Sequence, residues 1–145
     1  MKLSTRSRYG LRAILELAMC YGQGPIQIKS IAEKQDISNK YLEQLMAILK
    51  SAGLVRSVRG AKGGYILAKE PKEITISDVF LTLEGPLITV ECLEHPEFCT
   101  KCTDCAARYV WGKIHDSIRK VMGAITLQDL VDKSQTGFDT VNYQI

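Results

Sequence analysis

The hydrophobic pattern of this chain changes its period near Gly53, and that change limits the folds open to it. Before Gly53, apolar residues recur every three or four positions, which is the spacing of one face of an α-helix. After it, two short apolar runs, 54–58 and 65–68, flank a glycine-rich turn, as in a β-hairpin. Helices followed by one two-stranded ribbon predict a mainly α fold with a small β-wing.

Three helices are expected before the ribbon. The first covers residues 4–21 and the second covers 28–35. The third follows Ser38, a residue type favoured at helix N-caps, and ends at Ala52. Three helices and a ribbon in this order are typical of a winged helix-turn-helix, whose second paired helix enters the major groove of DNA.

The second half of the chain is predicted to hold three more helices. Thr75 and Thr126 each begin a capping-box pattern. Between these two helices, residues 106–124 form a long amphipathic helix with an apolar stripe that includes Trp111. We expect the stripe to be a dimer interface, because so small a domain cannot hide it; intramolecular packing is the alternative.

Five segments follow from these boundaries. The expected parts are a winged helix-turn-helix DNA-binding region (1–70), a connecting helix and linker (71–91), a cysteine loop (92–105), a dimerisation helix with a C-terminal helix (106–133) and a polar tail (134–145).

Charge is divided unevenly along the chain. Residues 1–70 hold 12 Lys/Arg and 5 Asp/Glu, whereas residues 71–145 hold 7 and 11. A basic head on an acidic body suits nucleic-acid binding, although uneven solvated surfaces would give the same totals. With no 18-residue apolar stretch and no signal-peptide pattern, we expect a cytoplasmic protein without a membrane partner. No catalytic triad or paired-carboxylate motif is present, so we expect neither an enzyme nor a small-molecule substrate.

Polar residues on the third helix and at the tip of the ribbon are the candidate DNA contacts. Glutamine pairs with adenine and glutamate accepts from the cytosine amino group, so Gln44 and Glu43 suit base recognition. Arg59 and Lys62 suit phosphates or a narrow minor groove, and the neighbouring glycines let the ribbon approach the DNA backbone. Solvated surface is the alternative. The predicted set is Arg8, Lys29, Ser38, Lys40, Tyr41, Glu43, Gln44, Arg59, Gly60 and Lys62.

Four of the five cysteines lie in one short segment, Cys92-x6-Cys99-x2-Cys102-x2-Cys105. In a reducing compartment such a cluster indicates a metal site more often than disulfides, and soft thiolates select zinc or iron–sulfur centres. The last three cysteines, Cys99-x2-Cys102-x2-Cys105, resemble the first three ligands of a bacterial ferredoxin motif and favour an iron–sulfur cluster over zinc. The remaining thiol, Cys20, is expected to be an ordinary buried residue. A small iron–sulfur electron carrier is the rival function, although it would not need a basic wing.

The position of the cysteine loop suggests a switch. The loop directly precedes the long amphipathic helix, so binding or loss of a metal centre would order or release the start of that helix. The spacing of two DNA-reading heads would change with it. A transcriptional repressor or dual regulator is therefore the first functional hypothesis.

Several motifs are similar to those of one known superfamily. The segments LSTRSRYG (3–10), YLEQL (41–45) and SVRGAKGGY (57–65) resemble the winged-helix transcriptional regulators of the IscR/NsrR/CymR superfamily. LEGP (83–86) and TLQDL (126–130) extend the resemblance over nearly the whole chain. It implies a homodimer with crossing long helices that binds a pseudo-palindromic operator in double-stranded DNA.

Residue by residue, the resemblance implies DNA-contact roles in both elements of the head. Tyr41, Glu43 and Gln44 match the residues that read DNA in the recognition helix. Arg59 and Gly60 match wing contacts.

The cysteine loop resembles that of IscR-like members, which hold a 2Fe–2S cluster and regulate iron–sulfur biogenesis. The three matching cysteines are Cys92, Cys99 and Cys105. Where the IscR pattern has a histidine ligand, this chain has Arg108, which cannot bind iron. Cys102 or His95 is then the candidate fourth ligand, with a 2Fe–2S cluster favoured and a 4Fe–4S cluster as the alternative.

Two other branches of the superfamily match less well. NsrR-like nitric-oxide sensors use an acidic N-terminal ligand, and this chain has Arg8 in that region. CymR-like regulators lack the cysteine cluster. The loop cysteines thus favour an IscR-like regulator of iron–sulfur status, with nitric-oxide or redox sensing and a zinc-stabilised regulator as alternatives.

Overall fold

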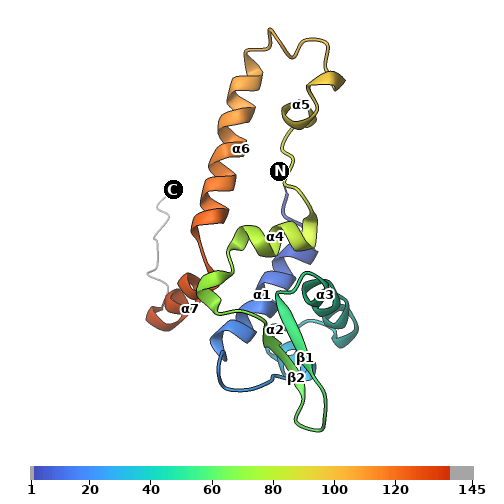
Figure 1. Ribbon diagram of the computed structural model, residues 1–145, viewed down its shortest axis with the longest axis vertical. Coiled ribbons are helices and arrows are strands. Elements are labelled where there is room, and N and C mark those ends of the chain that lie inside the picture. The colour runs from blue at the N-terminus through green and yellow to red at the C-terminus, as the bar shows by residue number, and fades with distance from the viewer. Residues whose placement is uncertain (1, 138–145) are drawn as a thin grey trace.

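The computed structural model describes residues 2–137, and they divide into a head and an extended helix (Figure 1). The head contains α1–α4, α7 and the two-stranded sheet, and α6 rises from it with the α5 segment alongside. The fold is mainly helical with a β-wing, as predicted. The elements are α1 (Thr5–Met19), α2 (Ile28–Gln35), α3 (Asn39–Ser51), β1 (Val55–Val58), β2 (Gly64–Leu67), the 3-10 helix η1 (Pro71–Glu73), α4 (Ile76–Glu84), α5 (Glu91–Glu94), the 3-10 helix η2 (Pro96–Phe98), α6 (Ala107–Ala124) and α7 (Leu127–Thr136).

The hydrophobic core lies entirely in the head. Helix α1 contacts α2, α3, α4, α7 and β2, and its Ile14 is completely buried. Leu42 and Leu49 of α3 and Val79 of α4 are completely buried in the same core. Burial of such side chains contributes about 1.5–3 kcal/mol each, so α1 is the element on which the head depends.

The N-terminus of α1 is joined closely to the C-terminus of α4. The Ser4 hydroxyl caps α1 by accepting from the Ser7 amide at 3.2 Å. The hydroxyls of Ser4 and Ser7 both donate to the Glu84 carboxylate at the end of α4. Gly10 lets the two helices approach, because a side chain there would overlap the Leu83 side chain.

Both predicted capping boxes are present, and they lie next to each other. The Thr75 and Thr126 hydroxyls accept from the amides of Asp78 and Asp129 at 3.1 and 3.2 Å. Thr75 and Thr126 also form an antiparallel bridge, flanked by Ile76 N to Ile125 O and Leu127 N to Ile74 O, both 2.9 Å. Through this bridge the chain returns to the head after α6.

The wing is held to the helical head by a backbone pair. β1 and β2 are antiparallel, and Tyr65 of β2 exchanges hydrogen bonds of 3.0 and 2.8 Å with Ile26. A Cβ at Gly64 would overlap the Ile26 carbonyl, and one at Gly63 would overlap the Val58 carbonyl. These two glycines are therefore required by the ribbon itself, and their role in the approach to DNA stays a prediction.

Within residues 2–137, no helix combines the length and the apolar character needed to cross a membrane.

Replacing Gly64 with alanine should destabilise the head. Gly64 has φ +153°, and its added methyl would meet the Ile26 backbone. We expect the free energy of unfolding to fall by about 1–3 kcal/mol, measured by urea denaturation. Gly123→Ala is the control, because nothing lies near Gly123 in α6 and alanine there should stabilise the helix by up to about 1 kcal/mol. Equal losses in both variants would contradict the Ile26 contact.

Candidate functional site

Helices α2 and α3 form the helix-turn-helix expected to face DNA. Between them, Asp36 adopts a left-handed conformation with φ 53° and Ile37 is buried. The Ser38 hydroxyl accepts from the Tyr41 amide at 3.2 Å and so caps α3. Ser38 is exposed, and its hydroxyl shapes the start of the recognition helix.

The polar face of α3 is open to solvent. Leu42, Leu45, Met46 and Leu49 point into the core, which leaves the opposite face free. The predicted base-reading residues Lys40, Glu43 and Gln44 are all exposed.

Tyr41 has a packing role that the sequence did not reveal. It is only half-exposed, and its ring packs edge-on against Tyr9 of α1 with the centroids 6.1 Å apart. The guanidinium groups of Arg8 and Arg12 lie 6.0 and 5.3 Å from the centre of the Tyr9 ring. Tyr41 therefore connects the recognition helix to a basic part of α1.

A buried carboxylate fixes α1 against α2. Glu16 is 5% exposed and accepts from Lys34 at 2.7 Å and from the Gln35 amide. The hydrogen bond to Glu16 raises the pKa of Lys34 above its ordinary value, so Lys34 is protonated at neutral pH. Arg12 adds hydrogen bonds of 2.8 and 2.6 Å to Gln35. Sequence reasoning missed this network, although a glutamate on the apolar face of α1 was a visible signal.

The remaining predicted DNA contacts are also on the surface. Arg59, Gly60 and Lys62 are exposed at the turn between β1 and β2, where Gly60 has φ 113°. Lys29 is exposed on α2 and Arg8 on α1. The structure thus places cationic groups on the wing, on α2 and on α1.

The cysteine loop is folded around one backbone carbonyl. The Cys92 carbonyl accepts from the Cys102 thiol at 3.5 Å and from Arg108 Nε and Nη2 at 3.3 and 3.2 Å. Cys92, Cys99 and Cys102 are half-buried, whereas Cys105 is exposed. Arg108, at the position where the resembling family has a histidine, links α6 to the loop.

The Cys102 thiol is in an unfavourable place for ionisation. Desolvation by burial raises its pKa above the ordinary value, while the Arg108 guanidinium acts in the opposite direction. The neighbouring Cys92 and Cys99 thiols add to the increase in the Cys102 pKa. These effects place the three half-buried cysteines in one electrostatic environment.

The donor chemistry of the loop fits a thiolate-bound centre, but the observed arrangement does not converge on one. In the described part of the chain, no group of three or more Cys, His, Asp or Glu side chains is placed to hold a metal ion. The alternative ligand His95 pairs with Glu97 at 3.2 Å and packs on Phe98. Metal binding would therefore require the loop to rearrange.

Cys20 lies apart from the loop. It is half-buried at the C-cap of α1, where a fully buried thiol was expected. The difference arises because α1 ends at Met19, so Cys20 no longer follows the apolar face of the helix.

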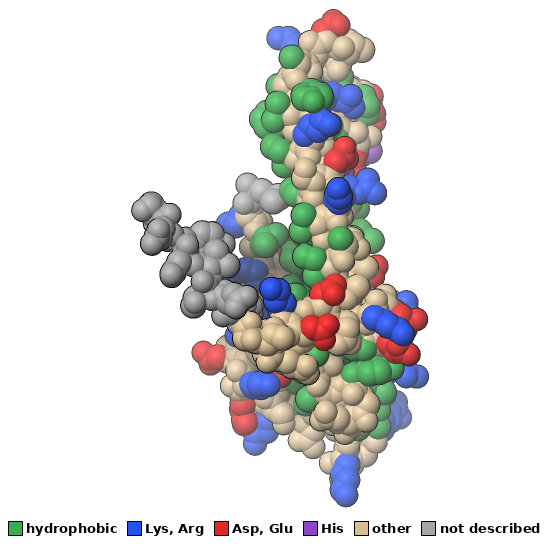
Figure 2. All heavy atoms as spheres, turned by 90° about the vertical axis from the view of Figure 1, so that its left-hand side faces the viewer, with side chains coloured by type: hydrophobic (Ala, Val, Ile, Leu, Met, Phe, Trp, Pro, Cys, Tyr) green, Lys and Arg blue, Asp and Glu red, His purple; other side chains and the backbone are tan. Residues whose placement is uncertain are grey.

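Helix α6 presents apolar side chains to solvent. None of its 18 residues is buried in this chain. Val110, Ile114 and Val121 are 48%, 44% and 58% exposed, and Trp111 is 39% exposed. Figure 2 shows hydrophobic side chains along one side of the elongated part of the molecule. An exposed apolar surface of this kind is typical of an interaction site.

Residues 3–133 match the Rrf2 family, which is described as iron-dependent transcriptional regulators. The chain belongs to the Rrf2 family. It is a transcriptional regulator with a DNA-binding winged helix, and its relatives are regulators rather than enzymes.

Rrf2-family relatives with two different names are similar to this chain. The regulator CymR of Bacillus subtilis is 47% identical over 130 residues, covering 90% of this chain and 89% of the relative. The regulator IscR of Photorhabdus laumondii is 34% identical and covers 93% of this chain and 82% of the relative.

Solved structures of Rrf2-family proteins give the same pair of names. The structure of CymR, the global cysteine regulator of B. subtilis, has a TM-score of 0.76 at 41% identity, covering 91% of this chain and 97% of that one. T. potens IscR has a TM-score of 0.77 at 41% identity, covering 95% and 93%. The solved structures thus do not separate CymR-like from IscR-like members, whereas the sequence identity is higher to CymR of B. subtilis than to IscR of P. laumondii.

Proposed function

We propose that this Rrf2-family regulator binds operator DNA as a homodimer, and that an iron–sulfur cluster on its cysteine loop controls that binding. The observation that supports it most is the gathering of four cysteines at the start of α6, with Cys102 and Arg108 both bound to the Cys92 carbonyl. A ligand that rearranges this loop necessarily acts on the first turn of α6. The family description as iron-dependent and the likeness to IscR support the same proposal.

The head binds DNA through α3 and the wing in this proposal. Lys40, Glu43 and Gln44 lie on the open face of α3 and are suited to base edges in the major groove. Arg59 and Lys62 at the wing tip are suited to phosphates. Of the other predicted contacts, Arg8 and Lys29 add charge for the DNA backbone, Ser38 and Gly60 shape the approaching turns, and Tyr41 orients α3.

A second copy of the chain covers the apolar face of α6. That helix of 18 residues is about 27 Å long and carries no buried side chain in one protomer, so two such helices can bury their stripes against each other. The head of each protomer then lies at a set distance from its partner's head. Two half-sites one helical turn apart on DNA demand this kind of spacing.

The cluster ligands in this proposal are Cys92, Cys99, Cys105 and, as the fourth, Cys102. Cys102 is favoured over His95 because it already contacts the Cys92 backbone, whereas His95 pairs with Glu97. We favour a 2Fe–2S cluster over a 4Fe–4S cluster, and place the protein in the reducing cytoplasm where thiolates persist. When bound, the cluster supplies sensitivity to iron, oxidants or nitric oxide, which are the candidate signals.

A regulator whose loop thiols hold no cluster is the second candidate. It is favoured by the 47% identity to CymR and by the absence of a three-donor group in residues 2–137. Metal analysis separates the two candidates.

Variants at Arg59 and Glu43 should affect DNA binding in different ways. Arg59→Ala should weaken binding to all sequences and reduce the salt-dependence slope by about 1, because a phosphate contact carries no sequence information. Glu43→Gln should alter the preferred bases at one position by about 1–3 kcal/mol. Fluorescence anisotropy with a selected operator measures both, and Lys120→Ala on α6 is the charge-matched control. Wild-type binding by both variants would exclude this docking.

Val121→Asp should dissociate the dimer. A carboxylate in an apolar helix–helix contact loses hydration without gaining a partner, so the association constant should fall at least about 100-fold. Sedimentation velocity measures the change. Lys120→Asp introduces the same residue one position away, on the polar side of α6, and should leave the dimer intact. A dimeric Val121→Asp protein would place the interface elsewhere.

Anaerobically purified protein should be coloured and contain iron and acid-labile sulfide. Cys99→Ser should remove most of both, whereas Cys20→Ser should retain them because Cys20 lies outside the loop. Iron and sulfide assays with an absorption spectrum decide the result. Colourless protein with stoichiometric zinc would instead indicate a zinc-stabilised regulator, and protein without metal would favour the cluster-free candidate.

A further inference from the structure

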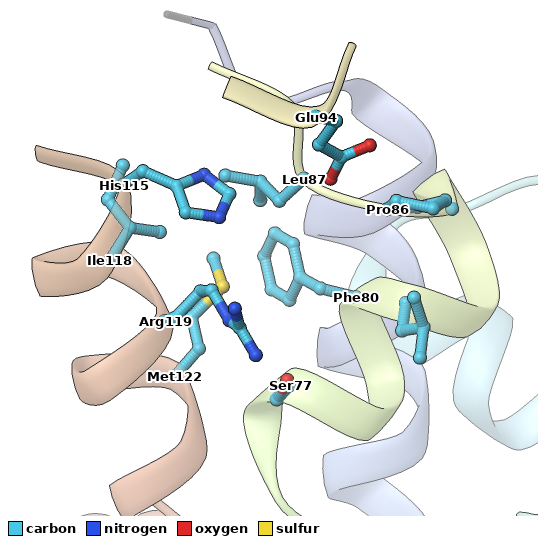
Figure 3. Close-up of a pocket in the computed structure, with 11 residues that line it drawn as sticks. Ser77, Phe80, Pro86, Leu87, Glu94, His115, Ile118, Arg119 and Met122 are labelled. Atoms are coloured by element: carbon cyan, nitrogen blue, oxygen red, sulfur yellow. The ribbon is translucent and has the colours of Figure 1, made fainter. Parts of the chain in front are cut away.

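A cavity of about 310 Å³ lies where the head meets α6 (Figure 3). Helices α4 and α6 form two of its walls, and the linker after α4 covers it together with α5. None of the lining residues is a cysteine or a predicted DNA contact. Its volume lies at the small end of ligand pockets, enough for a molecule of amino-acid size.

Two side chains with hydrogen-bond donors, His115 and Arg119, line this cavity and have no side-chain partner among the described residues. The His115 imidazole points toward the space beside Phe80, and its Nδ1 is buried without a hydrogen bond to any described residue. The Arg119 side chain is exposed; its guanidinium lies one turn further along α6, toward Ser77, and forms no ion pair within residues 2–137. A buried polar atom without a partner destabilises the folded chain, and a ligand atom that forms a hydrogen bond with it would remove that cost.

The opposite side of the cavity carries the opposite charge. Glu94 of α5 lies at the rim of the cavity, above Leu87, where it is exposed to solvent and forms no ion pair with Arg119 or another described cation. Between the charged groups lie the apolar side chains of Phe80, Leu87, Ile118 and Met122. The lining therefore combines a site for an anion, a site for a cation and an apolar surface.

We propose that this cavity binds a free α-amino acid with an apolar side chain. Arg119 would hold the carboxylate, with the Ser77 hydroxyl and the His115 ring as further hydrogen-bonding groups. Glu94 accepts from the ammonium group, and the ligand side chain lies on Phe80 and Met122. A simple carboxylic acid would leave Glu94 unpaired, and a simple amine would leave Arg119 unpaired.

Dimerisation through α6 leaves the cavity accessible. Successive residues of a helix differ in direction by about 100°. On that spacing His115 and Arg119 lie about 100° and about 140° from Ile114 of the exposed stripe, whereas Ile118 and Met122 border the stripe. A second copy on the stripe would therefore border the cavity at Ile118 and leave the side of His115 and Arg119 open.

An amino acid in this position would stiffen the joint between the DNA-binding head and α6. Within one chain, α6 contacts α4, which forms the opposite wall of the cavity. Its C-terminal end continues through the turn at Thr126 into α7 of the head. A ligand that bridges α4, α5 and α6 favours one orientation of the head. The resulting change in operator affinity is limited by the difference in ligand affinity between the two orientations. This inference needs neither the cluster nor the predicted DNA contacts.

Isothermal titration of the full chain with three probes of equal apolar body tests the proposal. L-Leucine carries both charged groups, 4-methylpentanoate lacks the amine and 3-methylbutylamine lacks the carboxylate. We expect L-leucine to bind at least about tenfold more tightly than either analogue, a difference of about 1.4 kcal/mol.

The variants assign each charge. Arg119→Gln should weaken L-leucine at least about tenfold and leave 3-methylbutylamine unchanged, whereas Glu94→Gln should weaken L-leucine and leave 4-methylpentanoate unchanged. Lys120→Gln, next to Arg119 but outside the cavity, should bind like wild type. Circular dichroism checks the fold of each variant.

Two results would overturn the inference: no binding of any probe at about 1 mM, or equal L-leucine affinity in wild type and Arg119→Gln. Iron content and operator affinity, measured on the same preparations without added probe, report on the proposed function separately. Failure of one therefore does not imply failure of the other.

Discussion

The close contact between α1 and α4 is the interaction on which the rest of the molecule depends. Gly10 has no side chain, which lets Leu83 approach α1. At the helix ends the Glu84 carboxylate accepts hydrogen bonds from the hydroxyls of Ser4 and Ser7. Helix α1 is thereby placed at the centre of the head, where α2, α3, α7 and β2 also contact it. The orientation of the recognition helix follows from that position, through Tyr41 on Tyr9 and through the Glu16 network with α2.

Residues 85–125 form a long segment that leaves the head at the C-terminal end of α4 and returns beside the N-terminal end of α4, at the Thr75–Thr126 bridge. All buried apolar residues of the described chain lie outside this segment. An element with no core of its own is held only weakly in one protomer. Events at the cysteine loop or at a second copy of the chain can therefore move α6 without unfolding the head. This mechanical separation suits a regulator, because a signal must change the position of a DNA-binding unit and preserve its structure.

Arg108 shows how one substitution changes the options of a site. A histidine would offer a ring nitrogen to a metal, but a guanidinium offers only donors. Here those donors bind the Cys92 carbonyl and fasten the loop to α6. The loop is then ordered by protein contacts before any metal arrives, and Cys102 lies at the same carbonyl. Binding of the proposed centre to Cys102 would remove the thiol hydrogen bond to that carbonyl, while Arg108 would still connect the loop to the first turn of α6.

The sequence alone determined the elements and their order, because hydrophobic periods, capping boxes and glycine positions act over a few residues. The change of period at Gly53, the capping boxes at Thr75 and Thr126 and the wing were all predictable on that basis. The exposed polar face of α3 was predictable for the same reason. Tertiary structure decided which helices meet, because those contacts join residues that no local pattern connects. Only the folded chain shows that Gly64 leaves room for the Ile26 backbone and that Tyr41 packs on Tyr9. The same holds for the cavity that His115, Arg119 and Glu94 line together.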